Sequence, residues 1–294
     1  QEVGTDMQLI SPRPYTMMHS EKPEKLVRWF IEETNNIIAR ECELYPETFR
    51  GVCGLPQNIG IAPERSLDEL ERCVDKLGFK GAMVHGLTDG LFIDDRKFWP
   101  IFERAQALDV PLYMHPAVPH PAVVEAYYKD YLDEFPGLLT AAWGFTVETA
   151  TQGIRLVLSG VFDAYPEVKI ILGHLGESLP FSLWRIDQAL ARQGNKNTLF
   201  SFRDYFCKHF WITTSGNFSD AANGLDWVIS NRVTYGIKVV NLSFSDGVAS
   251  NNAAASPCTG SNTANAIAQL KGLGVAVFAA SNPSEPPRKK RRTD

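Results

Sequence analysis

The chain has no uninterrupted apolar run of about 18 residues, the length a membrane-spanning helix needs. Its first residues, QEVGTDMQ, lack the basic segment and apolar stretch of a secretory signal. We therefore expect a cytoplasmic protein with no membrane partner. The chain does not open on Met, and a strand-like MQLIS follows almost at once, so we also expect that the first structural element is missing.

The sequence also lacks close pairs of cysteines and an excess of positive charge. The five cysteines form no CxxC or other close pair, and an odd number cannot all pair within one chain, which favours a reducing compartment. The formal net charge of -5 argues against a generally basic surface, so we expect no specific nucleic-acid partner. Apolar residues make up 44% and charged residues 21%, as is typical of a folded, enzyme-like protein.

Short apolar runs alternate with helical patterns over about the first 220 residues. The runs GVCGLP, FKGAMVHG, VPLYMHP, VKIILGHLGE and HFWITTSGNFS predict strands. Residues 23–45 and 66–78 predict helices, the second opening on a capping box of Ser66 and Glu69. Apolar strands alternating with helices indicate a parallel sheet covered by helices, and their number favours a (β/α)8 TIM barrel over the alternative, a doubly wound sheet.

Three histidines, His85, His115 and His174, stand where predicted strands end. A parallel barrel brings such strand ends together on one face. Imidazole binds transition metals and transfers protons near neutral pH, although a single strand-end histidine is also a common structural residue. Glu177 lies three residues after His174, where it either caps the next helix or accepts a hydrogen bond from the imidazole.

The motif GHLGE followed by LPFSLWRID, together with PLYMHP and HFWITTSGNFS, resembles the amidohydrolase-related family of metal-dependent decarboxylases and hydratases. The likeness is greatest to γ-resorcylate and 2,3-dihydroxybenzoate decarboxylases, and it covers about residues 6–219. It implies a (β/α)8 barrel that binds a divalent metal, zinc or manganese, at the carboxyl ends of its strands. It also implies a homo-oligomer that decarboxylates a hydroxylated aromatic acid, or hydrates a related ring-cleavage acid.

The resemblance implies roles for four residues of this chain. It places His115 as a metal ligand, and His174 with Glu177 as the proton-transferring pair beside a small-molecule carboxylic acid substrate. Arg185 in WRID would lie close to that pair, with a surface ion pair to Asp187 or a neighbour as the alternative. His85 stands where the family often has a small polar residue, so we place it near the substrate without a fixed role.

Two metal-binding motifs of the family have no recognisable counterpart in this chain. The family's first strand ends in Glu-x-His or His-x-His, and its last strand carries Asp in a Phe-Ser-x-Asp-Tyr-Pro-like context. We therefore expect a barrel that is incomplete at its first and last strands and binds metal weakly, since a catalytic site usually has about three protein ligands. Asp246 in LSFSDG could replace the lost Asp, or it is an ordinary loop residue.

Residues 224–282 resemble the middle of the subtilisin-like serine protease domain, with Asn282 at the position of that family's oxyanion-hole Asn. The family's Asp, His and Gly-Thr-Ser motifs are not found. A protease built on this segment would therefore have neither the nucleophile nor the base that peptide cleavage needs. We predict a join between unrelated sequences near Asp220. Residues 1–219 would then form the barrel portion, and residues 220–282 would complete it or be appended to it.

The last residues, 283–294, read PSEPPRKKRRTD and predict a disordered tail. Its basic run from Arg288 to Arg292 resembles a nuclear-import signal, which would add an import receptor as a partner and the nucleus as a location; a polyanion contact or a solvated terminus is the alternative. For the whole chain, the alternative to an enzyme is an inactive truncated or fused derivative that acts as a binding or interaction module. A serine protease fragment is a third hypothesis.

Overall fold

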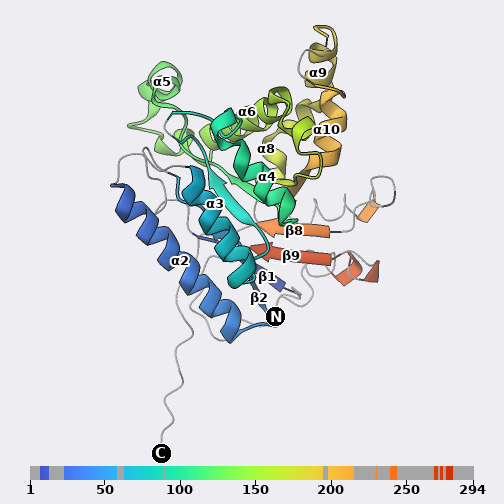
Figure 1. Ribbon diagram of the computed structural model, residues 1–294. Helices are drawn as coiled ribbons and strands as arrows, with labels where there is room; N and C mark the ends of the chain where they lie inside the picture. The colour runs from blue at the N-terminus through green and yellow to red at the C-terminus, as the bar shows by residue number, and fades with distance from the viewer. Residues whose placement is uncertain are drawn as a thin grey trace, which may run out of the picture.

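The structure is a computed structural model, and it describes residues 7–12, 23–57, 63–88, 90–194, 198–214, 229–230, 233, 239–243, 268–270, 272–273 and 276–280. Its strands lie in one parallel sheet, in the order β2-β1-β9-β8-β7-β6-β5-β4-β3. They are β1 (Met7–Ile10), β2 (Phe49–Gly51), β3 (Cys53–Gly54), β4 (Ala82–His85), β5 (Leu112–His115), β6 (Ile170–Leu172), β7 (Phe210–Thr214), β8 (Val239–Ser243) and β9 (Ala276–Ala280). Figure 1 shows β9 between β8 and β1.

The two ends of this strand order are joined by the chain itself. Only Val52 separates β2 from β3. The Val52 N–H donates to the carbonyl of Ile10 on one side (2.8 Å), and the Cys53 N–H donates to the carbonyl of Gly81 on the other (3.0 Å). Strands β2 and β3 are therefore two halves of one strand, and the sheet closes on itself as a barrel. This closure confirms the predicted (β/α)8 architecture.

The expected gaps at the first and last strands are not found. Strand β8 pairs with β7 through Thr213 and Asn241, and β9 pairs with β1 through Gln8 and Ala279. The prediction of an incomplete barrel was wrong because it rested on the family's metal-binding motifs. A parallel strand needs only a neighbour that presents backbone N–H and C=O groups in register, and the segment after residue 220 supplies two such strands. The exact domain boundary stays a prediction.

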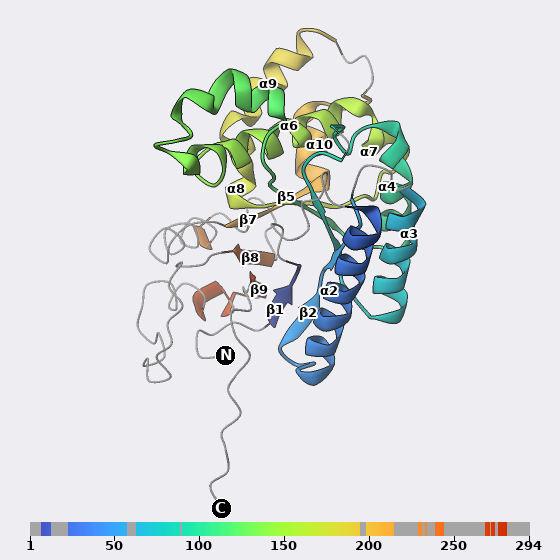
Figure 2. The same cartoon turned by 90° about the vertical axis from the view of Figure 1, so that its left-hand side faces the viewer.

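Helices cover the outside of the barrel, and Figure 2 shows α2, α3 and α4 along one side of it. The described helices are α2 (Glu24–Leu44), α3 (Pro63–Glu71), η1 (Arg72–Lys76), η2 (Arg96–Phe98), α4 (Trp99–Ala107), α5 (Pro121–Val123), η3 (Val124–Tyr128), η4 (Lys129–Tyr131), η5 (Pro136–Leu139), α6 (Gly144–Ser159), α7 (Val161–Ala164), α8 (His174–Glu177), α9 (Leu179–Ala191) and α10 (Phe202–His209). None of them is both long enough and apolar enough to cross a bilayer.

The capping box predicted at Ser66 and Glu69 does not form. Helix α3 begins at Pro63, three residues before Ser66, and proline at a helix start is favoured because its missing N–H has no partner to lose there. The Ser66 hydroxyl instead donates to the carbonyl of Pro56 (2.9 Å). A true capping box forms at α10, between Ser201 and Asp204.

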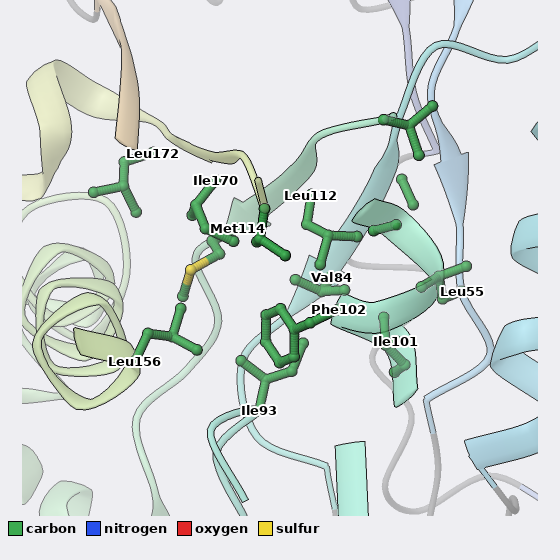
Figure 3. Close-up of a cluster of buried hydrophobic side chains, with 14 of the residues drawn as sticks. Leu55, Val84, Ile93, Ile101, Phe102, Leu112, Met114, Leu156, Ile170 and Leu172 are labelled. Atoms are coloured by element: carbon green, nitrogen blue, oxygen red, sulfur yellow. The ribbon is translucent and has the colours of Figure 1, made fainter. Parts of the chain in front are cut away.

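The main apolar core lies between the strands and the outer helices, as Figure 3 shows. Leu112 and Met114 of β5 are buried in it, together with Phe102 of α4 and Leu156 of α6. Successive side chains of a strand point to opposite faces. Tyr113 and His115 therefore face the interior of the barrel, and by the same alternation so does His85, which follows Val84 of the core.

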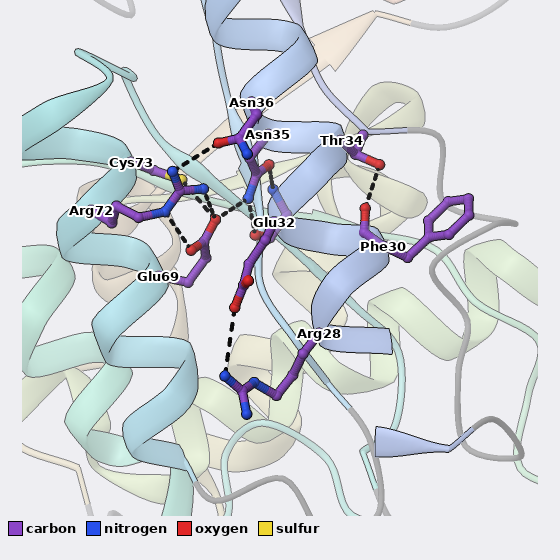
Figure 4. Close-up of polar contacts among 10 residues, drawn as sticks. Arg28, Phe30, Glu32, Thr34, Asn35, Asn36, Glu69, Arg72 and Cys73 are labelled. Atoms are coloured by element: carbon purple, nitrogen blue, oxygen red, sulfur yellow. Dashed lines mark hydrogen bonds and ion pairs between the residues drawn. The ribbon is translucent and has the colours of Figure 1, made fainter. Parts of the chain in front are cut away.

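A buried polar cluster ties α2 and α3 to the barrel (Figure 4). The Asn35 amide of α2 donates to the Gly54 carbonyl (3.0 Å) and to Oε1 of Glu69 (2.7 Å), and its oxygen accepts from the Gly54 N–H (2.9 Å). Arg72 donates to both carboxylate oxygens of Glu69 at 2.8 Å. Each polar atom thus finds a partner, which satisfies the requirement for burying such groups.

Candidate active site

His85 and His115 lie side by side at the ends of β4 and β5. The two residues are paired in the strand register, and their ring centroids are 5.5 Å apart with an interplanar angle of 40°. His85 is only 2% exposed. The backbone of His85 is clamped by the Gln57 side chain, whose Oε1 accepts from the His85 N–H (2.7 Å) and whose Nε2 donates to the His85 carbonyl (3.3 Å).

The loops that follow the two histidines touch each other. Gly86 has φ +43°, and a Cβ built there would lie 2.2 Å from the Cβ of Ala117. No side chain fits at position 86, and its left-handed backbone also favours glycine. Glycine at this position therefore allows the ends of β4 and β5 to approach closely.

The imidazole of His115 has a defined tautomer. Its Nδ1 lies 2.7 Å from the carbonyl oxygen of Pro116, and because a carbonyl only accepts, Nδ1 carries the proton. Burial lowers the pKa of His115 from 6.5 to about 4, with a smaller contribution from the neighbouring charge of His174. His115 is therefore neutral near pH 7 and presents a lone pair on Nε2, as a metal ligand must.

His174 and Glu177 form a hydrogen-bonded pair at the end of β6. Nδ1 of His174 lies 2.6 Å from Oε1 of Glu177. The Glu177 side chain is fully buried, whereas 39% of the His174 side chain is exposed. Of the two contacts considered from the sequence, the structure shows the hydrogen bond to the imidazole; helix α9, which begins just after Glu177, has no side-chain cap. A buried carboxylate can orient the imidazole while the ring keeps access to a substrate.

A left-handed turn brings the pair together. His174, Leu175, Gly176, Glu177 and Ser178 all have positive φ, between 46° and 72°. Each non-glycine residue in this conformation costs about 1–2 kcal/mol, so the turn must be held by its surroundings. One restraint is the hydrogen bond from the Gly176 N–H to the Gly173 carbonyl (2.8 Å). The resemblance implied that the two side chains form a pair, but nothing in the sequence predicted this backbone.

Two polar residues in the interior of the protein were missed from the sequence. A Cβ built on Gly173 would lie 3.0 Å from the Tyr113 hydroxyl and 3.5 Å from Oε1 of Glu177, so Tyr113 reaches the pair from inside the barrel. The alternation along β5, which puts Tyr113 on the face of His115, could have identified it. Glu148, the second, is buried on α6, a helix that contacts α8; burial raises the pKa of Glu148 from 4.5 to about 7.

Of the remaining predicted site residues, Arg185 lies in the described part of the chain. Arg185 is exposed on α9, and within the described part of the chain no hydrogen bond or ion pair joins it to His174, Glu177 or Asp187. Asp187 accepts instead from the Arg203 N–H (3.1 Å). Three earlier predictions lie outside the described residues: Asp246 as a metal ligand, Asn282 as an oxyanion-hole residue, and the basic run of the tail.

The fit of the site to a divalent metal depends on its histidines. Among the described residues, no group of three or more His, Cys, Asp or Glu side chains is arranged to hold an ion. The two imidazoles of His85 and His115 are adjacent, however, and neutral imidazole is a good ligand for zinc and related ions. The described part of the chain therefore offers two nitrogen donors for a metal.

Comparison with known proteins identifies relatives of this chain. Residues 1–236 match the family described as Amidohydrolase. Gamma-resorcylate decarboxylase from Polaromonas sp. is 43% identical over 193 residues, which cover 63% of this chain and 57% of the relative. The chain thus spans less than two thirds of the length of that curated relative.

Solved structures show the same fold. A dihydroxybenzoic acid decarboxylase from Polaromonas sp., with bound manganese and the inhibitor 2-nitroresorcinol, superposes with a TM-score of 0.69 at 34% identity, covering 82% of this chain and 71% of the other. A 2,6-dihydroxybenzoate decarboxylase in complex with 2,6-dihydroxybenzoate superposes with a TM-score of 0.65 at 32% identity, covering 86% and 73%. The predicted resemblance to such decarboxylases is therefore confirmed.

Proposed function

This chain belongs to the amidohydrolase family, and on that premise we propose that it is a metal-dependent nonoxidative decarboxylase of a hydroxylated aromatic carboxylic acid. The observation that carries the proposal is the 2.6 Å contact between His174 and Glu177 at the strand ends. The relatives support it, because a gamma-resorcylate decarboxylase and a dihydroxybenzoic acid decarboxylase are among them. The partner is a small-molecule carboxylic acid.

The proposed chemistry uses the imidazole of His174 to move one proton. Glu177 accepts a hydrogen bond from the Nδ1–H of His174 and holds the ring, so that Nε2 exchanges a proton with the substrate. Protonation of the ring carbon that bears the carboxylate makes the ring an electron sink. Carbon dioxide then leaves, and the electrons of the broken carbon–carbon bond return to the ring.

A divalent metal held by His115, manganese or zinc, would supply positive charge that binds the carboxylate and the adjacent hydroxyl of the substrate. The interior position of Tyr113 beside Glu177 suits it to contact the same ligand. These two residues orient the substrate so that the ring carbon meets His174.

We extend the proposal to self-association of the chain. Helix α9 carries two aromatic side chains one turn apart, Phe181 and Trp184, which are 85% and 75% exposed. Large exposed aromatic side chains of this kind are enriched at protein interfaces. Sedimentation velocity of the wild type and of a Phe181→Ser, Trp184→Ser double variant tests this, with a shift to monomer as the expected result.

The test of function is a decarboxylation assay of the full chain, supplied with manganese or zinc and with 2,6- or 2,3-dihydroxybenzoate. We expect release of the dihydroxybenzene and carbon dioxide, and a loss of about 100-fold or more in kcat for His174→Ala. His120→Asn is the matched control, since Asn keeps the helix cap that His120 provides to Ala122. Full turnover in His174→Ala would remove the proposed role of that residue, and no turnover in the wild type would favour a binding module.

A further inference from the structure

We infer that His85 and His115 are joint ligands of one borderline transition-metal ion, such as zinc or cobalt(II), so that His85 is a metal ligand rather than a substrate contact. The inference deepens the proposed function, which requires a metal. It also differs from the family pattern described above, in which His85 occupies a position that often holds a small polar residue.

The first support is the separation of the two rings. A zinc ion about 2.1 Å from a coordinating imidazole nitrogen lies about 3.2 Å from the ring centroid. Two such ligands at a tetrahedral angle put their centroids about 5.2 Å apart. The observed separation between the centroids of His85 and His115 is 5.5 Å, with the rings inclined by 40°. The distance therefore fits a single ion between the rings.

The second support is the chemistry of the donor atoms. The Nδ1 of His115 donates to the Pro116 carbonyl, which leaves the Nε2 lone pair of His115 to coordinate an ion. A metal-bound histidine commonly donates its other ring N–H to a carbonyl or carboxylate in this way. His85 lies in register with His115 on the neighbouring strand, so both side chains leave the same face of the sheet.

The third support is the rigidity of the pair. Gln57 hydrogen-bonds both backbone groups of His85, and Gly86 allows close contact with Ala117 immediately beyond the two histidines. A metal site binds tightly when its ligands are held before the ion arrives. The two strand ends therefore present imidazoles whose spacing is set by the barrel rather than by flexible loops.

The donor type determines which ion is preferred. Imidazole nitrogen suits zinc, cobalt and copper, whereas manganese favours carboxylate and water oxygen. The described acids at the strand ends do not join the pair, since no group of three potential ligands is found among the described residues. A two-imidazole site should therefore take zinc or cobalt(II) more tightly than manganese.

The experiment measures metal binding directly and needs no turnover. The metal-free full chain is titrated with cobalt(II) chloride, and binding is followed by calorimetry and by the visible absorption of cobalt. A parallel sample with copper(II) is examined by electron paramagnetic resonance, which counts coordinated nitrogens. The variants are His85→Asn, His85→Gln and His115→Asn, with His120→Asn as the control.

We expect one cobalt(II) per chain, two coordinated nitrogens in the copper spectrum, and weaker cobalt binding by about 100-fold in each variant of His85 or His115. The copper spectrum of either His85 variant should show one nitrogen. The control should bind as the wild type does. Circular dichroism without metal identifies any His85 variant that fails to fold, and the other is then used.

Several outcomes would overturn the inference. Binding that is lost in His115→Asn but unchanged in both His85 variants would exclude His85 as a ligand and leave the decarboxylase proposal standing. A wild type that binds no cobalt(II), or binds it equally in every variant, would reject the two-histidine site. If both histidines are required but the wild type does not decarboxylate, the metal site stands and the proposed function fails. If neither His85 variant folds, a copper spectrum of the wild type with only one nitrogen overturns the inference.

Discussion

The imidazole of His174 and the carboxylate of Glu177 are joined at 2.6 Å across a backbone that is left-handed from His174 to Ser178. The two residues are three positions apart, but the backbone that connects them is not an ordinary right-handed helical turn. Strained backbone of this kind is typically retained where the surrounding structure holds it and function requires it. Position and orientation of the imidazole therefore depend both on the carboxylate and on the turn.

Replacing Glu177 by Gln should lower kcat by about 10- to 100-fold and leave KM nearly unchanged. The amide can still accept a hydrogen bond, but it has no negative charge to stabilise the protonated imidazole of His174. Decarboxylation kinetics measure the effect. Glu167→Gln is the control, because Glu167 is an exposed acid that pairs with Lys208 (3.6 Å). An equal loss in both variants would contradict a specific role for Glu177.

Replacing Gly176 by Ala should destabilise the fold by about 2–5 kcal/mol. The residue has φ +72°, and a Cβ there would lie 2.8 Å from Ile212 and 3.0 Å from Pro180. Gly78→Ala is the matched control, since Gly78 has φ +70° with nothing within 4 Å of its Cβ. Urea denaturation should show a loss of about 1–2 kcal/mol in the control. Similar losses in the two variants would show that the contacts of Gly176 are unimportant.

Replacing Glu148 by Gln should change how stability depends on pH. Burial raises the pKa of this carboxyl from 4.5 to about 7, so the folded state holds a proton that the unfolded state has released. The wild type therefore loses stability as the pH rises from about 4.5 to 7, and the loss levels off above that range. The amide has no such loss, so Glu148→Gln should be more stable than the wild type by about 2–3 kcal/mol at pH 8.

Denaturation at pH 4.5 and at pH 8 checks this prediction. The difference between Glu148→Gln and the wild type should be smaller at the lower pH, where Glu148 is protonated in the folded state. Glu125→Gln serves as the control, because Glu125 is exposed and paired with Lys129. A stability difference for Glu148→Gln that is the same at both pH values would show that its charge is not buried.

Replacing Asn35 by Ala should cost about 2–4 kcal/mol of stability. The change removes three hydrogen bonds and leaves the N–H and carbonyl of Gly54, as well as Glu69, short of a partner in a buried place. Asn36→Ala is a control one residue away, since Asn36 is exposed and only accepts from Arg72 (2.8 Å). A melting-temperature shift no larger than that of the control would contradict the structural role of the cluster.

The amino-acid sequence by itself determined the local features of this protein. Alternating apolar runs and helical patterns were sufficient to predict the parallel barrel, because strand and helix periodicity are written in neighbouring residues. The strand-end positions of His85, His115 and His174 followed from the same runs. The spacing in GHLGE left two contacts open for Glu177, a helix cap or a hydrogen bond to His174, and the family resemblance pointed to the second.

The tertiary structure alone decided which distant segments meet. The closure of the barrel depends on the pairing of β9 with β1, about 270 residues earlier. Backbone N–H and C=O groups make this pairing, so no sequence motif reveals it. The strand register brought His85 beside His115, and the packing around α6 buried Glu148. The left-handed turn after Gly173 could not be predicted, because its strain is supported by the packing of α8 against β7. Long-range packing, which no local pattern records, thus placed the residues of the site.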